Sequence, residues 1–129
     1  MDEKWILIID DEENFCEMIK MNLEASGKYK ALTAYSGEEG IAMAKSTKPD
    51  IILLDISMPK MDGFEVLKAL KAHAVTSSIP VIMLSALDDD SSKMRASEMY
   101  SEHYFTKPAT TEELIAKIER VLELRGRQR

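Results

Sequence analysis

The sequence predicts a single α/β domain built on a parallel β-sheet. Three short apolar runs, rich in branched residues and without polar alternation, are typical of strands covered on both faces: residues 5–9, 51–54 and 81–84. The segments between them have helical spacing and separate the runs too widely for hairpins, which favours right-handed β-α-β connections. A chain of 129 residues, 45% of them hydrophobic, suits one domain with its own core.

In the first half of the chain, helical segments follow the apolar runs. We expect a helix over residues 13–26, because its apolar residues share one face and a glycine follows it. Ser36 and Glu39 have the spacing of a capping box and would open a second helix. Residues 30–34, between these helices, are predicted to form a weaker strand.

The second half continues the alternation. Phe64, Leu67 and Leu70 mark a third helix. Residues 88–100 offer few apolar side chains to a core, so we expect a mobile helix there. Residues 103–106 supply a short fifth strand.

The last helix begins after a second capping box, formed by Thr110 and Glu113, and carries its apolar residues at helical spacing. We therefore place the domain at residues 1–124. The arginine-rich residues 125–129 are expected to be a solvated tail or the start of a linker.

Composition and charge exclude several classes of protein. Seventeen Lys and Arg against twenty-three Asp and Glu give a net charge of −6, which argues against direct nucleic-acid binding. No apolar run approaches the roughly 18 to 20 residues of a membrane helix. Cys16, the one cysteine, cannot form an internal disulfide, and the first residues do not resemble a secretory signal. We therefore expect a reducing, cytoplasmic location and interpret Cys16 as a packing residue.

Polar residues follow the predicted strands at one edge of the sheet. Asp10 and Asp11 come after the first strand, Asp55 after the third and Ser85 after the fourth, while Lys107 follows the fifth. In an open parallel sheet, ligands bind in the crevice beyond the carboxyl ends of the strands. These five side chains are therefore expected to converge there.

Three neighbouring carboxylates need a counter-charge, because each pair repels by about 4 kcal/mol at an effective dielectric near 20. The ligands are hard oxygens without His or Cys, which favours Mg²⁺ over zinc. Mg²⁺ commonly shares its site with a phosphate. Lys107 would offer that phosphate an ammonium group, and Ser85 a hydroxyl donor.

These residues resemble the response regulator receiver domain, the phosphoacceptor half of two-component signalling. The resemblance covers nearly the whole chain and implies a flavodoxin-like (βα)5 three-layer sandwich with strand order 2-1-3-4-5. It rests on I-I-D-D-E at residues 8–12, L-L-D-I-S-M-P at residues 53–59, M-D-G at residues 61–63, S-A at residues 85–86 and Y-F-T-K-P at residues 104–108.

The resemblance implies a role for each site residue. Asp55 would accept a phosphoryl group from the phosphohistidine of a histidine kinase or phosphotransfer protein. Asp11, Asp55 and the main-chain carbonyl of Ser57 would hold Mg²⁺ directly, and Asp10 would act through a metal-bound water. Lys107 would pair with the incoming phosphoryl group, with the peptide bond that follows it expected to be cis.

Ser85 and Tyr104 resemble the pair that reports phosphorylation in this family. The hydroxyl would move toward the phosphoryl group, and the ring would rotate inward behind it. The surface formed by the fourth helix, fifth strand and fifth helix would then change for a protein partner or a phosphorylation-dependent dimer. The chain would be a signalling domain that assists only its own phosphorylation and dephosphorylation, not an enzyme.

Some positions depart from the family pattern. Ser57 and Leu87 occupy the two positions that set autodephosphorylation in the family, and a leucine cannot orient a water. We therefore predict a phosphoryl lifetime longer than in fast chemotaxis-type receivers. Residues 100–101 also differ from the common pattern, which indicates a differently built end of the fourth helix. Ala109 stands where the family often has an aromatic residue, which removes a packing group near the fifth helix.

Two other functions compete with this hypothesis. A phosphorylation-independent interaction module would not need the intact set of Asp, Ser and Lys side chains. An aspartate-nucleophile phosphatase would need a second acid where Ser57 stands, and a cap domain does not fit in this length. Asp10 and Asp11 could simply cap the first helix, but capping does not explain Asp55 or Lys107.

Other conspicuous residues are expected to have structural roles. Residues 88–90, three aspartates, are interpreted as capping and solvated groups. His73 and His103 are expected at the surface and not as phosphocarriers. Trp5, five residues before Asp10, is expected to lie close enough to the site to report on it by fluorescence.

Overall fold

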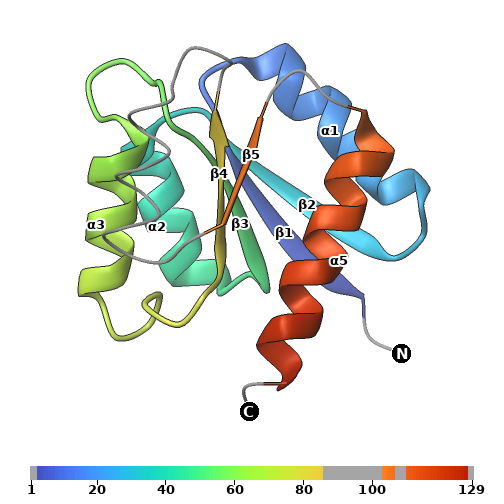
Figure 1. The fold of residues 1–129 in the computed structure, drawn as a ribbon. Coiled ribbons are helices and arrows are strands. Elements are labelled where there is room, and N and C mark those ends of the chain that lie inside the picture. Colours follow the sequence, from blue (N-terminus) through green and yellow to red (C-terminus); the bar gives the residue numbers. More distant parts are fainter. Residues whose placement is uncertain (1–2, 86–102, 107–109, 128–129) are drawn as a thin grey trace.

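The computed structural model describes residues 3–85, 103–106 and 110–127. Five parallel strands form one sheet in the order β2-β1-β3-β4-β5, with helices on both faces (Figure 1). The strands are β1 (Lys4–Ile9), β2 (Tyr29–Ala34), β3 (Ile51–Asp55), β4 (Val81–Ser85) and β5 (His103–Thr106), and the helices are α1 (Glu13–Ala25), α2 (Gly37–Thr47), α3 (Gly63–Ala72) and α5 (Thr111–Arg127). The predicted fold class and strand order are confirmed.

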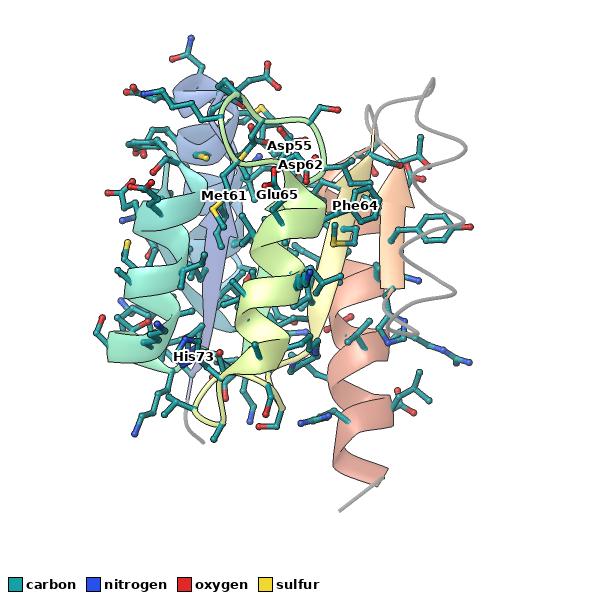
Figure 2. All side chains as sticks on the ribbon, turned by 90° about the vertical axis from the view of Figure 1, so that its left-hand side faces the viewer. Asp55, Met61, Asp62, Phe64, Glu65 and His73 are labelled. Carbon is teal, nitrogen blue, oxygen red and sulfur yellow. The ribbon has the colours of Figure 1, made fainter. Side chains whose placement is uncertain are left out.

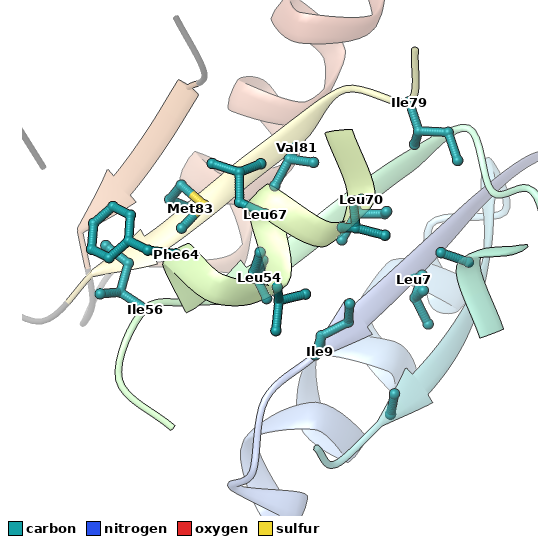
Figure 3. Close-up of a cluster of buried hydrophobic side chains, with 14 of the residues drawn as sticks. Leu7, Ile9, Leu54, Ile56, Phe64, Leu67, Leu70, Ile79, Val81 and Met83 are labelled. Carbon is teal, nitrogen blue, oxygen red and sulfur yellow. The ribbon is translucent and has the colours of Figure 1, made fainter. Parts of the chain in front are cut away.

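The sheet divides the core into two layers, because successive residues of a strand point to opposite faces. Leu7 and Ile9 of β1 pack under α2 and α3, while Ile6 and Ile8 pack under α1 and α5. Figure 3 shows the first layer, where α3 lies across β3 and β4. The unbroken apolar runs in the sequence are therefore explained by burial on both faces.

Most element boundaries agree with the sequence within one residue. β2 begins at Tyr29, one residue earlier than expected, because Tyr29 is buried with only 4% exposed. α5 extends through Arg127, three residues beyond the expected end of the domain at residue 124. The helix expected at residues 88–100 lies outside the described residues.

The helix starts show which capping signals were correct. Thr110 and Glu113 form the predicted reciprocal capping box at α5, with bonds of 3.1 and 3.2 Å. At α2 the Ser36 side chain accepts the Glu39 N–H, but the Glu39 carboxylate accepts the N–H of Tyr35, one residue before the cap. The second half of that predicted box is therefore shifted by one residue.

β2 is an edge strand, and carboxylates occupy part of its outer side. Glu24 of α1 accepts the N–H of Ala31 in the middle of β2 at 3.1 Å. Glu39 of α2 accepts the N–H of Tyr35, directly after β2, at 2.7 Å. Exposed strand edges invite pairing with other chains, and side chains that bind their amides remove that opportunity.

Candidate functional site

Three carboxylates meet at the carboxyl ends of β1 and β3. Asp10 and Asp11 follow β1, Asp55 ends β3, and each offers an oxygen within 4.8 Å of the others. Their convergence follows from strand pairing, because Ile9 of β1 lies opposite Leu54 of β3. The structure thus brings together the three acids that the sequence predicted to meet.

Burial makes this cluster electrostatically demanding. Asp10 is completely buried and Asp55 is 7% exposed, whereas Asp11 faces solvent. Two unit negative charges at 4.8 Å repel by about 3.5 kcal/mol at an effective dielectric of 20. The arrangement therefore favours a cation beside these oxygens, and hard carboxylate donors fit Mg²⁺.

Asp10 is held in place through its own backbone and side chain. Its N–H donates to the Ala34 carbonyl at 3.0 Å, its carbonyl accepts from the Cys16 thiol at 3.3 Å, and its Oδ1 accepts the Glu12 N–H at 3.0 Å. Asp10 therefore does stabilise the turn into α1, as the capping alternative supposed. That role does not explain why Asp55, which belongs to another strand, is buried beside it.

The loop after Asp55 folds back against the strand end. The N–H of Ile56 donates to Leu84 of β4 at 3.0 Å, and the N–H of Gly63 donates to the Ile56 carbonyl at 2.8 Å. A Cβ at Gly63 would lie only 2.4 Å from the carbonyl oxygen of Asp55 and 2.7 Å from the Cα of Ile56. Only glycine permits this approach, which fixes the main chain of Asp55.

Residues 61–63 fasten the same loop to α3. Asp62 and Glu65 form a capping box with bonds of 3.0 and 3.1 Å, at the end of α3 where Asp55 lies (Figure 2). Met61 packs beside Gly37, where a Cβ would meet its Cγ at 3.1 Å. The M-D-G motif thus positions the site. The acidic residue followed three positions later by Glu was the available sequence signal for this cap.

Ser85 ends β4 next to the carboxylates. Its neighbour Leu84 is paired with Asp55, and Ser85 itself is completely buried. Within the described residues its hydroxyl has no hydrogen-bond partner. Leaving such a group unsatisfied costs about 1–3 kcal/mol, so this hydroxyl is suited to a ligand oxygen arriving at the site.

The remaining predicted site residues have mixed outcomes. Tyr104 lies on β5 opposite Met83 and is 40% exposed, so its ring is not in the inward position that the resemblance associates with phosphorylation. Ser57 lies exposed in the loop two residues after Asp55. Lys107 and Leu87 lie outside the described residues.

Trp5 was wrongly expected to lie near the site. It stands at the beginning of β1, and its N–H donates to Asp50 at 2.8 Å. Five residues of strand place it about 16 Å from Asp10, at the opposite edge of the sheet. His73 also lies at the end of α3 far from Asp55 (Figure 2), and it is exposed, as expected.

A hollow beside Asp11 was not foreseen from the sequence. It has a volume of about 330 Å³, and Met58, Pro59 and Lys60 line it on the side of the β3–α3 loop. Lys60 has a φ of 67°, a conformation in which glycine is the favoured residue. The hollow exposes Asp11 to solvent on the side of α2. Nothing in the spacing of these residues indicated it.

Within the three described ranges, no helix combines the length and apolar character needed to cross a membrane.

Comparisons with known proteins agree with this geometry. The family model for the response regulator receiver domain matches residues 6–119. The chain is 40% identical over 119 residues to the alkaline phosphatase synthesis transcriptional regulatory protein PhoP of Bacillus subtilis, covering 92% of this chain and 48% of PhoP. It is 37% identical to the protein PilH of Pseudomonas aeruginosa, covering 91% of this chain and 96% of PilH. The chain thus spans about half the length of PhoP but nearly all of PilH.

Solved structures resemble the chain in the same way. The chemotaxis protein CheY4 of Vibrio cholerae matches with a TM-score of 0.84 at 28% identity, covering 93% of this chain and 99% of that one. A response regulator receiver domain protein from Clostridium thermocellum matches with a TM-score of 0.88 at 29% identity, covering 98% and 99%.

Proposed function

This chain belongs to the response regulator receiver domain family of two-component signalling, and we propose that Asp55 is its phosphoacceptor. One observation carries the proposal. The buried carboxylates of Asp10 and Asp55, the exposed Asp11 and the buried hydroxyl of Ser85 meet at the carboxyl ends of three adjacent strands. This set offers a nucleophile, donors for a divalent cation and a hydrogen-bond donor to a phosphoryl oxygen.

In the proposed reaction, a carboxylate oxygen of Asp55 attacks the phosphorus of a phosphohistidine on a histidine kinase or phosphotransfer protein. The new P–O bond forms as the P–N bond breaks, and the imidazole leaves with the electron pair. The product is an acyl phosphate on Asp55. Phosphoryl transfer of this kind depends on positioning and charge stabilisation, so no general base is required.

Mg²⁺ would be held by Asp11, Asp55 and the carbonyl of Ser57, with Asp10 acting through water. When bound, the cation would offset the negative charge of the carboxylates and the phosphoryl oxygens. Asp10 is buried and held by its bonds to Glu12, Ala34 and Cys16, so it provides a fixed negative charge beside the cation.

The proposed switch uses Ser85, Lys107 and Tyr104. A shift from 1:99 to 99:1 between two states requires about 5.5 kcal/mol, whereas one hydrogen bond to a charged group gives about 1.5–3. Ser85 alone therefore cannot supply the bias. Lys107, the cation and the inward movement of Tyr104, which is now 40% exposed, would share it and alter the surface that β5 and α5 form with the expected fourth helix.

The partners follow from the same proposal. A sensor histidine kinase or phosphotransfer protein would act upstream, in the cytoplasm, and a protein partner or effector domain downstream. PhoP is described as a transcriptional regulator, and this chain spans only about half of it. The output of this receiver is therefore proposed to depend on a protein region other than the receiver itself, with no nucleic acid bound by the receiver.

Phosphorylation of the purified chain by acetyl phosphate and Mg²⁺ tests the proposal. Intact mass should show a gain of one phosphoryl group in the wild type and none in Asp55→Ala or in EDTA. Asp62→Asn is the matched control, because it changes an acid on the adjacent loop while asparagine keeps the capping function. It should be phosphorylated like the wild type.

A wild-type chain that takes up no phosphoryl group under these conditions would support the phosphorylation-independent module. Metal-dependent turnover of p-nitrophenyl phosphate would support the phosphatase instead. Phosphorylation that persists in Asp55→Ala would place the acceptor elsewhere.

A further inference from the structure

A second hollow lies at the opposite edge of the sheet, where the strands begin. Its volume is about 310 Å³, and its lining includes Lys4, Lys48, Asp50, Pro80 and Arg125. Figure 1 shows the start of β1 and the end of α5 on this side of the molecule. The carboxylate cluster is at the other end of β1, so the two sites are separate.

The charge of this hollow is positive in a protein with a net charge of −6. Lys4, Lys48 and Arg125 contribute three cations against the single carboxylate of Asp50. An oxygen of Asp50 already accepts the Trp5 N–H at 2.8 Å, so this carboxylate has less capacity to form ion pairs with the cations. Among the described residues, one ion pair is shorter than 4.0 Å, and it joins Lys28 to Glu119. Lys4, Lys48 and Arg125 do not take part in it.

The backbone holds two of these cations at helix ends. Lys48 closes α2 with a φ of 49°, a left-handed conformation for which glycine is usually chosen, and its N–H donates to Ala44 at 3.0 Å. Arg125, in the last turn of α5, donates to the carbonyl of Ser78 and keeps its other N–H groups for further acceptors. Both cations therefore lie at the carboxyl ends of helices, on the same side of the molecule as Lys4.

A second hollow of about 520 Å³ adjoins the first, since Lys4 and Leu122 line both. Its surface is mostly apolar, but Glu3, Glu119 and Glu123 also line it, so an anionic group is favoured in the first hollow and not in the second. Tyr29 lies in the wall of this second hollow. A ligand with an anionic end and a flat apolar part would place its anion among the cations and its apolar part along Leu122. An arginine fork with two lysines suits a phosphate dianion better than a single carboxylate.

We propose that this edge of the sheet binds a small phosphate monoester with an aromatic or similarly apolar group, at a site formed by Lys4, Lys48, Arg125 and Leu122. The site is independent of the proposed phosphoacceptor, because its residues lie at the amino ends of the strands and at the ends of α2 and α5.

Titration with phenyl phosphate tests the proposal, using the wild-type chain in EDTA so that transfer to Asp55 does not interfere. Two-dimensional NMR should show saturable shifts of the amides of Trp5, Asp50 and Ile79, which flank the hollow. Inorganic phosphate should bind more weakly, since it lacks the apolar part, and phenol more weakly still.

Substitutions of the cationic residues test which of them bind the phosphate. The double variant Lys48→Gln/Arg125→Gln should weaken binding by about tenfold or more, as expected for losing charge-assisted hydrogen bonds. Lys4→Gln should also weaken it, and this residue ends no helix, so its effect is separable from helix stability. Lys68→Gln on the exposed side of α3 is the matched control and should bind normally.

Several results would overturn the proposal. Shifts that do not saturate, or that sodium chloride reproduces at equal ionic strength, would mean that the cations serve only as counter-charges to the helix ends. Shifts centred on Asp11 and Gly63 would place the ligand at the carboxylate cluster. Asp55→Ala should leave phenyl phosphate binding unchanged, so failure of the phosphoacceptor proposal would not be confused with failure of this one.

Discussion

Replacing Gly63 with alanine tests whether the close approach of the β3–α3 loop fixes the site. The new Cβ would lie 2.4 Å from the carbonyl oxygen of Asp55, while ordinary contact begins at 3.4 Å, so the backbone must move by about 1.0 Å. That movement strains the 2.8 Å bond from Gly63 to Ile56. Losing the bond costs about 1 kcal/mol and overpacking about 1–3, so we expect a loss of 2–4 kcal/mol.

Urea and thermal unfolding measure this loss. For 129 residues at about 2.1 cal/mol/K each, the unfolding entropy is about 270 cal/mol/K, so 2–4 kcal/mol lowers Tm by about 7–15 °C. Phosphorylation from acetyl phosphate should slow by about tenfold to a hundredfold, because Asp55 is displaced. Gly126→Ala is the control, since nothing lies within 4 Å of its new Cβ, and its stability should be unchanged or higher by up to about 1 kcal/mol.

Alanine is a better helix former than glycine, and Gly63 is the first residue of α3. If the backbone contact did not matter, Gly63→Ala would be as stable as the wild type or more stable, and its phosphorylation rate would be normal. Either finding would refute the argument that this glycine positions Asp55.

Three further predictions concern a helix cap, a buried phenol and the phosphoryl group. Ser36→Ala removes the acceptor for the Glu39 N–H and should cost about 1 kcal/mol in urea unfolding, whereas Ser36→Asp should cost little; equal losses would contradict a capping role. Burial, with a smaller contribution from the charge of Glu119, raises the pKa of Tyr29 above 10.0. The unfolded chain therefore loses this proton first as pH rises, so stability should fall above pH 10, and by less in Tyr29→Phe; identical pH profiles would contradict this. The acyl phosphate should outlast those of fast chemotaxis-type receivers, because Leu87 cannot orient a water, and half-loss within seconds at neutral pH would contradict that prediction.

The sequence predicted the sheet and the acidic cluster because both depend on patterns with a fixed geometry. Apolar runs separated by helical segments require parallel strands, and residues that follow such strands must share an edge. Asp10, Asp11 and Asp55 are brought together for that reason alone. Family resemblance, and not spacing, supplied the roles of Ser57 and Tyr104.

Features that depend on distances between side chains and backbone were not predictable in this way. The fit of Gly63 against Asp55 requires the path of a loop, which no local pattern encodes. The position of Trp5 was wrongly predicted because proximity in sequence was taken for proximity in space. An extended strand rises about 3.3 Å per residue, so five residues separate two side chains widely. The reach of Glu39 to Tyr35 in place of Ser36 likewise depends on how β2 enters α2.

The carboxylates on the outer side of β2 affect how copies of this protein associate with one another. Glu24 occupies the amide of Ala31, and Glu39 occupies that of Tyr35 just beyond the strand. A second chain that tried to extend the sheet at β2 would have to displace both carboxylates and leave them without these donors. Growth of the sheet from chain to chain is thus opposed at this edge by side chains that also tie α1 and α2 to the strand, so the same bonds that hold the domain together help to keep its copies apart.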